Sequence, residues 1–319
     1  ALLALAAALF GVSPASVLVV LGDGAFGSAL AIRGSVLKSI PLLLTGLCVV
    51  IAFRGGVWNI GAEGQVIAGA IAAWLASPFG TIAAILAAAI AGAAWASIAT
   101  AMRLWRNAPE VLTTILLNFI AIHLLGWVVN GPLRERSGRY PQTDPAAAAL
   151  PEIAGIHGGV AIAIAAAIAS WWLLYYTAEG LRLRATGLNP SAARYSGINV
   201  PAQIARAMAI SGAVAGLAGA IELLGVTHRL FERFAAGYGY SGIAVALLAG
   251  LHPLGALAAF AAPAANRTGS ASRSRASSGS RSPQRSRDVR RLRSATPSAR
   301  ASRFSASASD CSSSSPRAR

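Results

Sequence analysis

The sequence has few charged residues. Asp, Glu, Lys and Arg make up 12% of the chain, whereas 55% of its residues are hydrophobic. A soluble domain usually carries about 25% charged residues, so an ordinary soluble enzyme is excluded. The chain has a single lysine, Lys38, and no Gly-x-x-x-x-Gly-Lys-Ser/Thr pattern. ATP hydrolysis by a P-loop is therefore excluded for this chain.

Cysteine and histidine are also scarce. The two cysteines, Cys48 and Cys311, are too few for a disulfide framework. The four histidines are widely scattered and show no metal-ligand spacing. No pairing of a nucleophile with a base stands out either. We therefore expect no metal, no cofactor and no catalytic residue, which means that the chain is not an enzyme.

The charges that are present are unevenly distributed. Residues 1–263 carry 14 Arg or Lys and 9 Asp or Glu, whereas residues 264–319 carry 13 Arg and 2 Asp. We interpret 1–263 as a transmembrane domain. The Ser/Arg-rich segment 264–319 has too few large apolar side chains to fold by itself, and we predict a disordered tail.

The tail has two interpretations. One is an arginine-rich arm that binds nucleic acid or anionic lipid. The other is a coding sequence that is read out of frame after a frameshift near residues 260–266, because the tail has arginine without lysine and begins abruptly within an apolar run. We favour the frameshift, which makes nucleic-acid binding an unlikely role. The chain also starts inside an apolar segment at Ala1, which we interpret as a truncated first span.

Long apolar runs recur along the first 263 residues. A membrane-spanning helix needs roughly 20 mostly apolar residues. The sequence therefore predicts an all-α, polytopic membrane protein with about eight segments. They lie at 1–13, 35–53, 66–77, 79–102, 111–130, 158–177, 202–225 and 242–262. Residues 14–34 and 131–157 are expected to be connections outside the membrane.

Arginine positions predict the orientation, because arginine-rich connections usually face the cytoplasm. Arg103, Arg106 and the connection 178–206 then lie on the cytoplasmic side. This arrangement leaves the three arginines of segment 134–139 outside, against the rule.

Residues 53–65 are unusual for a membrane protein. They hold four glycines together with Asn59, Glu63 and Gln65, between two apolar runs. Polar, glycine-rich backbone at membrane depth is tolerated only where it is buried in protein or lines a water-filled cavity. Residues 239–246 repeat the glycine spacing, and both runs later meet a Pro-x-Gly. We predict two broken helices in a weak internal repeat, a pattern that is typical of a transporter site.

The connection 178–201 contains a helix signal. Asn189 is a good N-cap and Pro190 a good first residue, so residues 191–196 are predicted to form a short helix that stops at Gly197. Spacing alone leaves two readings open. One is a surface loop that follows the arginine rule, and the other is a docking helix for a cytoplasmic partner.

Four segments, in order along the chain, resemble the nucleoside-type permeases of ABC importers. These permeases belong to the larger ribose and branched-chain amino acid permease family. The matching segments are residues 54–65, 109–118, 184–198 and 239–248, and the resemblance covers residues 14 to about 260. Members of that family have further helices at both ends, which are missing from this chain.

The resemblance implies a permease subunit that moves nucleosides or related simple sugars across the cytoplasmic (inner) membrane. Its partners would be a second permease, two ABC ATP-binding subunits and an extracytoplasmic substrate-binding lipoprotein. Segment 184–198 resembles the coupling loop that contacts the ATPases. The residues carried over to that role are Gly187, Asn189, Pro190, Ala192, Ala193, Arg194, Tyr195 and Gly197.

Six residues are candidates for substrate contact. Aromatic rings can stack on a nucleobase, and amides or a carboxylate can bond to ribose hydroxyls. The candidates are Trp58, Asn59, Glu63, Gln65, Asn118 and Tyr240.

Each candidate also has a structural interpretation. Glu63 could cap the N-terminus of a half-helix, and Asn118 could bond to a neighbouring helix. The aromatic Trp58 and Tyr240 could belong to an interfacial belt.

Two other functions stay open at this stage. The chain could be an ion-coupled secondary transporter of a small polar solute. It could also be a basic-tailed membrane anchor without a transport role.

Overall fold

The computed structural model describes residues 13–153, 156–235 and 237–259. The described chain is almost entirely helical, as the sequence predicts. Strand is limited to a small antiparallel hairpin, which pairs β1 (Glu152–Ile153) with β2 (Ile156–His157). The tail 264–319, and the expected span at 1–13 apart from Ser13, lie outside the described residues.

Among the described residues, five helices are long and apolar enough to cross a membrane. They are α3 (Ala29–Arg54), α5 (Thr81–Arg106), α6 (Glu110–Asn130), α7 (Gly159–Tyr176) and α10 (Val200–Glu222), which continues as one π-helical turn over Leu223–Thr227. The expected count of about eight spans is not reached in the described part of the chain.

Shorter helices accompany the long ones. α4 (Ala62–Ala76) and α11 (Tyr238–Leu248) follow the two glycine-rich breaks. The segment predicted as one span over 242–262 is instead interrupted between α11 and α12 (Pro253–Ala259). Gly250 and Leu251 both have positive φ there, at 61° and 55°, and Pro253 then starts the new helix. That backbone cannot continue a right-handed helix.

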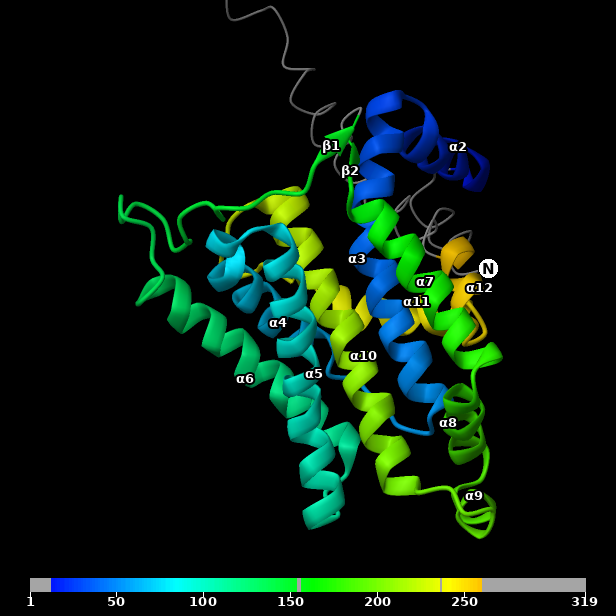
Figure 1. The fold of residues 1–319 in the computed structure, drawn as a ribbon. Coiled ribbons are helices and arrows are strands. Elements are labelled where there is room, and N and C mark those ends of the chain that lie inside the picture. The colour runs from blue at the N-terminus through cyan, green and yellow to red at the C-terminus, as the bar shows by residue number, and fades with distance from the viewer. Residues whose placement is uncertain (1–12, 154–155, 236, 260–319) are drawn as a thin grey trace, which may run out of the picture. The chain divides into compact units, whose positions relative to one another are not determined.

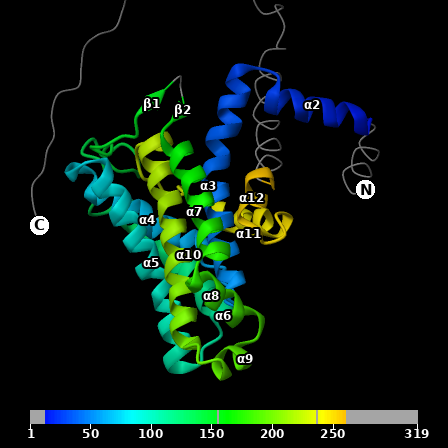
Figure 2. The same cartoon turned by 45° about the vertical axis from the view of Figure 1, so that its right-hand side comes forward.

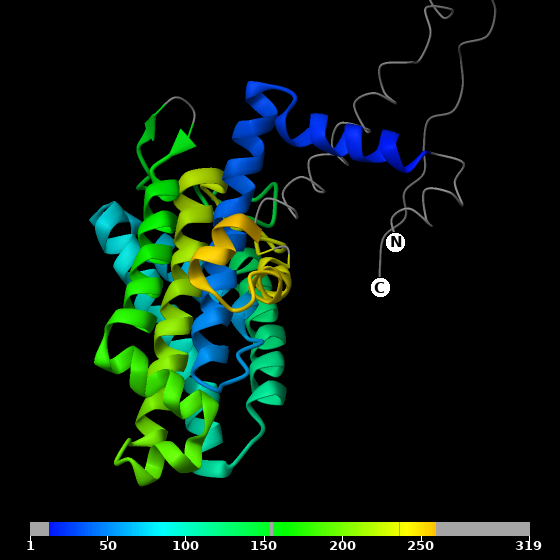
Figure 3. The same ribbon diagram turned by 90° about the vertical axis from the view of Figure 1, so that its right-hand side faces the viewer.

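Residues 14–34, predicted as a connection outside the membrane, are largely helical. Residues Pro14–Phe26 form helix α2, and α3 begins at Ala29, so the candidate span starts earlier than residue 35. Ser13 caps α2 by accepting a hydrogen bond from the Ser16 amide at 3.1 Å, and Ser28 caps α3 in the same way. These caps start the two helices. Figure 3 shows α2 leaving the bundle at an angle to α3.

Helix α10 is the centre of the bundle. It packs against α3, α4 and α5, and Figures 1 and 2 show it between α5 and α3. Glycines allow this close packing: a Cβ added at Gly92 of α5 would lie 2.2 Å from the Gly212 carbonyl oxygen of α10. The hydrophobic effect contributes little to the association of helices within a membrane. Small residues that let two backbones approach closely are therefore usual at such crossings.

The two ends of the bundle carry different structures (Figure 1). At one end lie α8 (Ala178–Leu188), α9 (Pro190–Tyr195), the end of α5 and the start of α10. We call this the α9 end. The β1–β2 hairpin lies at the other end, which we call the hairpin end. Both arginine-bearing connections predicted to be cytoplasmic therefore lie on the same side.

The connection after α6 is held closely over the hairpin end. Its backbone bonds to the segment after α10, through Thr143 N to Leu230 O at 3.0 Å and Leu150 N to Leu224 O at 2.9 Å. Glu135, whose side chain is 7% exposed, pairs with Arg229 at 3.0 Å. This connection therefore fastens the segment that leads into α11.

Glu135 is a strong acid in this position. It accepts hydrogen bonds from the Ser137 hydroxyl, the Gln142 amide at 2.7 Å and the Tyr140 backbone at 3.1 Å. These bonds, led by the one from Ser137, and the charge of Arg229 lower the pKa of Glu135 to about 2. The carboxylate is therefore charged at any physiological pH.

Candidate functional site

The first break separates α3 from α4. Gly56 has a φ of 73°, and a Cβ on it would lie 2.8 Å from the Cα of Gly187 in α8. Only glycine combines that φ with that proximity. The Asn59 side chain then accepts a hydrogen bond from the Gly61 amide at 2.9 Å, immediately before α4 starts.

The side-chain amides of Asn59 and Gln65 close this break with buried hydrogen bonds. Asn59 and Gln65 bond to each other through both ends of their side chains, each at 3.0 Å. Asn59 also donates to the hydroxyl of Ser211 in α10 at 2.8 Å, and that hydroxyl donates to the Cys48 carbonyl of α3. Both amides are at most 1% exposed. Their hydrogen bonds satisfy groups that would otherwise be costly to bury.

Glu63 joins the two broken helices. Its carboxylate accepts hydrogen bonds from the backbone amides of Gly237 and Gly239, each at 2.7 Å. These amides begin α11, so Glu63 of α4 caps the other half-helix. A negative charge at a helix N-terminus is favourable. The two N-termini touch, because a Cβ on Gly239 would lie 2.2 Å from the Glu63 nitrogen. Glu63 therefore has the capping role that the sequence had left open.

Asn118 of α6 links both breaks. Its oxygen accepts a hydrogen bond from the Gly64 amide at 2.8 Å, and its nitrogen donates to the Ile60 carbonyl at 2.9 Å. The same nitrogen donates to the Tyr240 hydroxyl at 3.2 Å. Asn118 is fully buried. One amide thus holds α6 against the start of α4 and against α11.

The two aromatic candidates differ from the four polar ones. Trp58 is 56% exposed and its ring lies 4.8 Å from that of Phe53. Tyr240 is 42% exposed. Trp58 and Tyr240 are therefore exposed in this conformation, whereas the four polar candidates are buried and bonded within the protein.

Sequence reasoning missed three members of this site. Ser211 supports the first break, and Thr45 donates its hydroxyl to the Tyr238 carbonyl at 3.0 Å at the second. The echo of Thr45-Gly46 in Ser211-Gly212 was the signal that could have found them. Glu222 accepts a hydrogen bond from the Tyr238 hydroxyl at 3.3 Å.

The residues of the predicted coupling loop lie at the α9 end. Asn189 caps α9, and its side-chain oxygen accepts from the Ser191 and Ala192 amides at 3.1 and 3.0 Å. Pro190 is the first residue of α9, and Gly197, with a φ of 79°, follows its end. The predicted short helix is therefore confirmed.

The faces of this loop differ in exposure. Ala193 is buried, whereas Tyr195 is 95% exposed and Leu188 is 87% exposed. Ala192 and Arg194 are also exposed on α9. Two large apolar side chains thus project from the α9 end.

Gly187 connects this loop to the first break. A Cβ on it would lie 2.2 Å from the Arg54 carbonyl oxygen. Arg54 in turn donates its Nε hydrogen to the Leu251 carbonyl at 2.9 Å, just beyond α11. The end of α3 therefore contacts both α8 and the segment after α11.

No cluster of three or more His, Cys, Asp or Glu side chains that could hold a metal is found among the residues that the structure describes. In this arrangement two half-helices meet at the buried carboxylate of Glu63.

Comparison with known proteins identifies the family. Residues 31–262 match the family described as the branched-chain amino acid transport system / permease component. The guanosine ABC transporter permease protein of Bacillus subtilis is 34% identical over 264 residues, which are 78% of this chain and 76% of that protein.

Two further relatives carry related descriptions. The glucose ABC transporter permease protein of Haloferax volcanii is 34% identical over 66% of this chain and 61% of its own length. The nucleoside ABC transporter permease protein of Lactococcus lactis subsp. cremoris is 30% identical over 73% of this chain and 70% of its own length. No solved structure matches. The chain therefore belongs to the branched-chain amino acid transport system permease family, and it is an integral membrane permease component of the ABC importer class.

Proposed function

We propose that this chain is the transmembrane permease subunit of an ABC importer that moves nucleosides or related simple sugars across the cytoplasmic membrane. The observation that carries the proposal is the meeting of two half-helices at Glu63, with exposed aromatic rings at Trp58 and Tyr240. The printed descriptions of the relatives name guanosine, glucose and nucleosides. All of these are uncharged, hydroxyl-bearing solutes.

The site offers suitable contacts for such a solute. Trp58 and Tyr240 present rings on which a flat base or a sugar face can stack. Asn59, Gln65, Asn118 and Glu63 bond to each other, to neighbouring helices and to α11. When the half-helices part, Glu63 loses its bonds to Gly237 and Gly239, and Asn118 loses its bond to Tyr240. Glu63 and Asn118 are then free to bond to the solute. Alternating between these two arrangements would move the solute past the break.

The energy comes from partners. The chain would assemble with a second permease subunit and with cytoplasmic ATP-binding subunits, while an extracytoplasmic substrate-binding protein delivers the solute. Leu188 and Tyr195 at the α9 end are exposed apolar anchors of the kind that dominate protein interfaces. We assign the docking of the ATPase to this end, with Asn189 and Pro190 setting the start of α9.

Reconstitution tests the function. The chain is placed in proteoliposomes with its partner permease, ATP-binding subunits and binding protein, and uptake of tritiated guanosine and glucose is measured. Uptake should need ATP and the binding protein. Uptake driven by an ion gradient through this chain alone would instead show a secondary transporter and would overturn the proposal.

A double substitution tests the docking role. Replacing Asn189 and Pro190 by alanine removes the cap and the preformed first turn of α9. ATP hydrolysis by the complex should persist while ATP-driven uptake is lost. Unchanged uptake would count against docking at α9. Membrane insertion, measured by carbonate extraction, serves as the control.

A further inference from the structure

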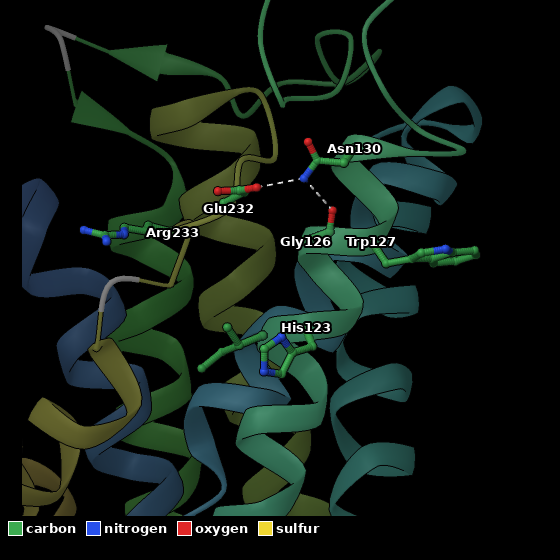
Figure 4. Close-up of a pocket in the computed structure, with 7 residues that line it drawn as sticks. His123, Gly126, Trp127, Asn130, Glu232 and Arg233 are labelled. Atoms are coloured by element: carbon green, nitrogen blue, oxygen red, sulfur yellow. Dashed lines mark hydrogen bonds between the residues drawn. The ribbon is translucent and has the colours of Figure 1, made fainter.

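A cavity lies beside the second break, toward the hairpin end. It has a volume of about 440 Å³ and is lined by one face of α6 and by the segment before α11 (Figure 4). A second cavity of about 370 Å³ adjoins it. The two share Ile122, Glu232 and Arg233, and the second also reaches Glu63. The pair therefore leads from the surface of α6 to the carboxylate at which the half-helices meet.

One hydrogen bond crosses the outer cavity. Asn130 of α6 donates to Glu232 at 2.7 Å and to the Gly126 carbonyl at 2.9 Å, as the dashed lines of Figure 4 show. The segment before α11 is thereby fastened to α6. The Trp127 ring points to the opposite side of α6 from Glu232 (Figure 4), so it does not close the cavity.

Polar groups around the cavity remain available to a ligand. His123 and Arg233 make no hydrogen bond or ion pair within the described part of the chain, and Glu232 uses only one of its two oxygens, for the bond to Asn130. All three side chains are exposed. The cavity thus offers a guanidinium, an imidazole and a carboxylate oxygen without a partner in this structure.

This set of groups suits one chemical class. A pair of adjacent hydroxyls can donate to a carboxylate and accept from a guanidinium at the same time. An anionic solute would face the carboxylates of Glu232 and Glu63, and a cationic solute would face Arg233. The volume lies within the roughly 300–1,000 Å³ that is usual for small-molecule sites. An uncharged, hydroxyl-rich ring satisfies both the charge and the volume.

We propose that the two joined cavities are a vestibule, in which the hydroxyl-rich ring of an uncharged solute binds before it reaches Glu63 and Tyr240. The proposal rests on the proposed transport function and adds a binding step to it. Arg233 and the free oxygen of Glu232 hold the hydroxyls, while Gly126 leaves room for the ring, because a Cβ added there meets no atom within 4 Å.

Filling the cavity tests the route. Gly126→Trp adds a large side chain at a position that lines the outer cavity and has space for a Cβ. Leu124→Trp is the matched control, on the same helix at an exposed position that lines neither cavity. In the reconstituted complex, Gly126→Trp should lower ATP-driven guanosine uptake by roughly tenfold, a factor worth about 1.4 kcal/mol. Equal uptake by the two variants would overturn the vestibule.

Thiol protection tests binding without transport. Gly126→Cys is combined with Cys311→Ser, and Cys48 is fully buried. The complex is labelled with a polar maleimide in the absence of ATP. Guanosine or glucose at ten times its dissociation constant should slow labelling about tenfold, and Glu232→Gln or Arg233→Gln should abolish that protection. Guanosine monophosphate, which is anionic, should not protect.

These outcomes separate the two proposals. If the unmodified complex shows no ATP-driven uptake but guanosine protects Gly126→Cys, the transport function fails and the vestibule stands. If uptake occurs and neither guanosine nor glucose protects, the vestibule fails and the transport function stands. Protection by guanosine monophosphate as strong as that by guanosine would overturn the assignment to uncharged solutes.

Discussion

The two broken helices are built differently. At the first break, Asn59 and Gln65 are buried and bonded to each other and to α10, and α4 packs against α5 and α10. At the second break, the N-terminus of α11 is capped by Glu63 from another helix, and polar side chains such as Arg233 face a cavity. The first break is thus held by bonds between its own side chains, with Ser211 of α10 and Asn118 of α6 added, whereas the amides that begin α11 are capped by a side chain of another helix. We therefore expect α11 to be displaced more easily than α4.

The largest effect is expected from Glu63→Ala. The substitution leaves the amides of Gly237 and Gly239 without their acceptor, which should lower the free energy of unfolding by about 4 kcal/mol. Hydrogen exchange should accelerate over residues 237–245 and stay unchanged over 66–76. Glu63→Gln, which keeps one acceptor oxygen, is the control and should lose less. Equal acceleration of hydrogen exchange in both segments would contradict the proposed difference between the two breaks.

A smaller effect is expected from Asn59→Ala. It removes the partner of Gln65 and Ser211 in a fully buried network, at a cost of about 2 kcal/mol in unfolding free energy. Thermal unfolding in detergent measures this loss. The rate of hydrogen exchange should rise first around residues 57–65. If hydrogen exchange rose over α11 instead, the stability of the first break would not be independent of that of the second.

The smallest effect is expected from lowering the pH. The pKa of Glu135 is about 2 in the fold, below its ordinary value of 4.5, so the unfolded connection binds a proton more readily than the folded one. The stabilisation is complete above about pH 4.5 and is lost as the pH falls from there to about 2.

Because Glu135 pairs with Arg229 ahead of α11, acid should loosen only the second break. Limited proteolysis of segment 131–151 at pH 5 and pH 3 measures this. Glu135→Gln should remove the difference, and an equal change at the first break would contradict the assignment.

The sequence predicts the long helices well because length and apolarity decide them. The spans expected at 111–130 and 158–177 differ by one residue at most from α6 and α7 at each end. Both breaks are also predicted, from glycine spacing. The helices within 14–34 were not predicted, although Ser13 and Ser28 cap them.

The contacts of the site are harder to predict. Glu63 and its donor partner Gly237 are 174 residues apart, so no local pattern reveals which half-helix Glu63 caps. The cavity residues were missed for the same reason, since Asn130 and Glu232 meet only after α6 and α11 are placed. Short-range signals locate polar residues at membrane depth, and only the tertiary fold determines their partners.

The contact between Gly187 and Arg54 has a mechanical consequence. The two residues approach each other through backbone atoms, which cannot rotate away as side chains do, so a shift of either backbone must be accommodated by the other. The Arg54 guanidinium then bonds to the Leu251 carbonyl. We expect a displacement of α8 toward Arg54 to reach the segment after α11 through this one residue. Arg54 therefore connects the α9 end to the segment that follows α11.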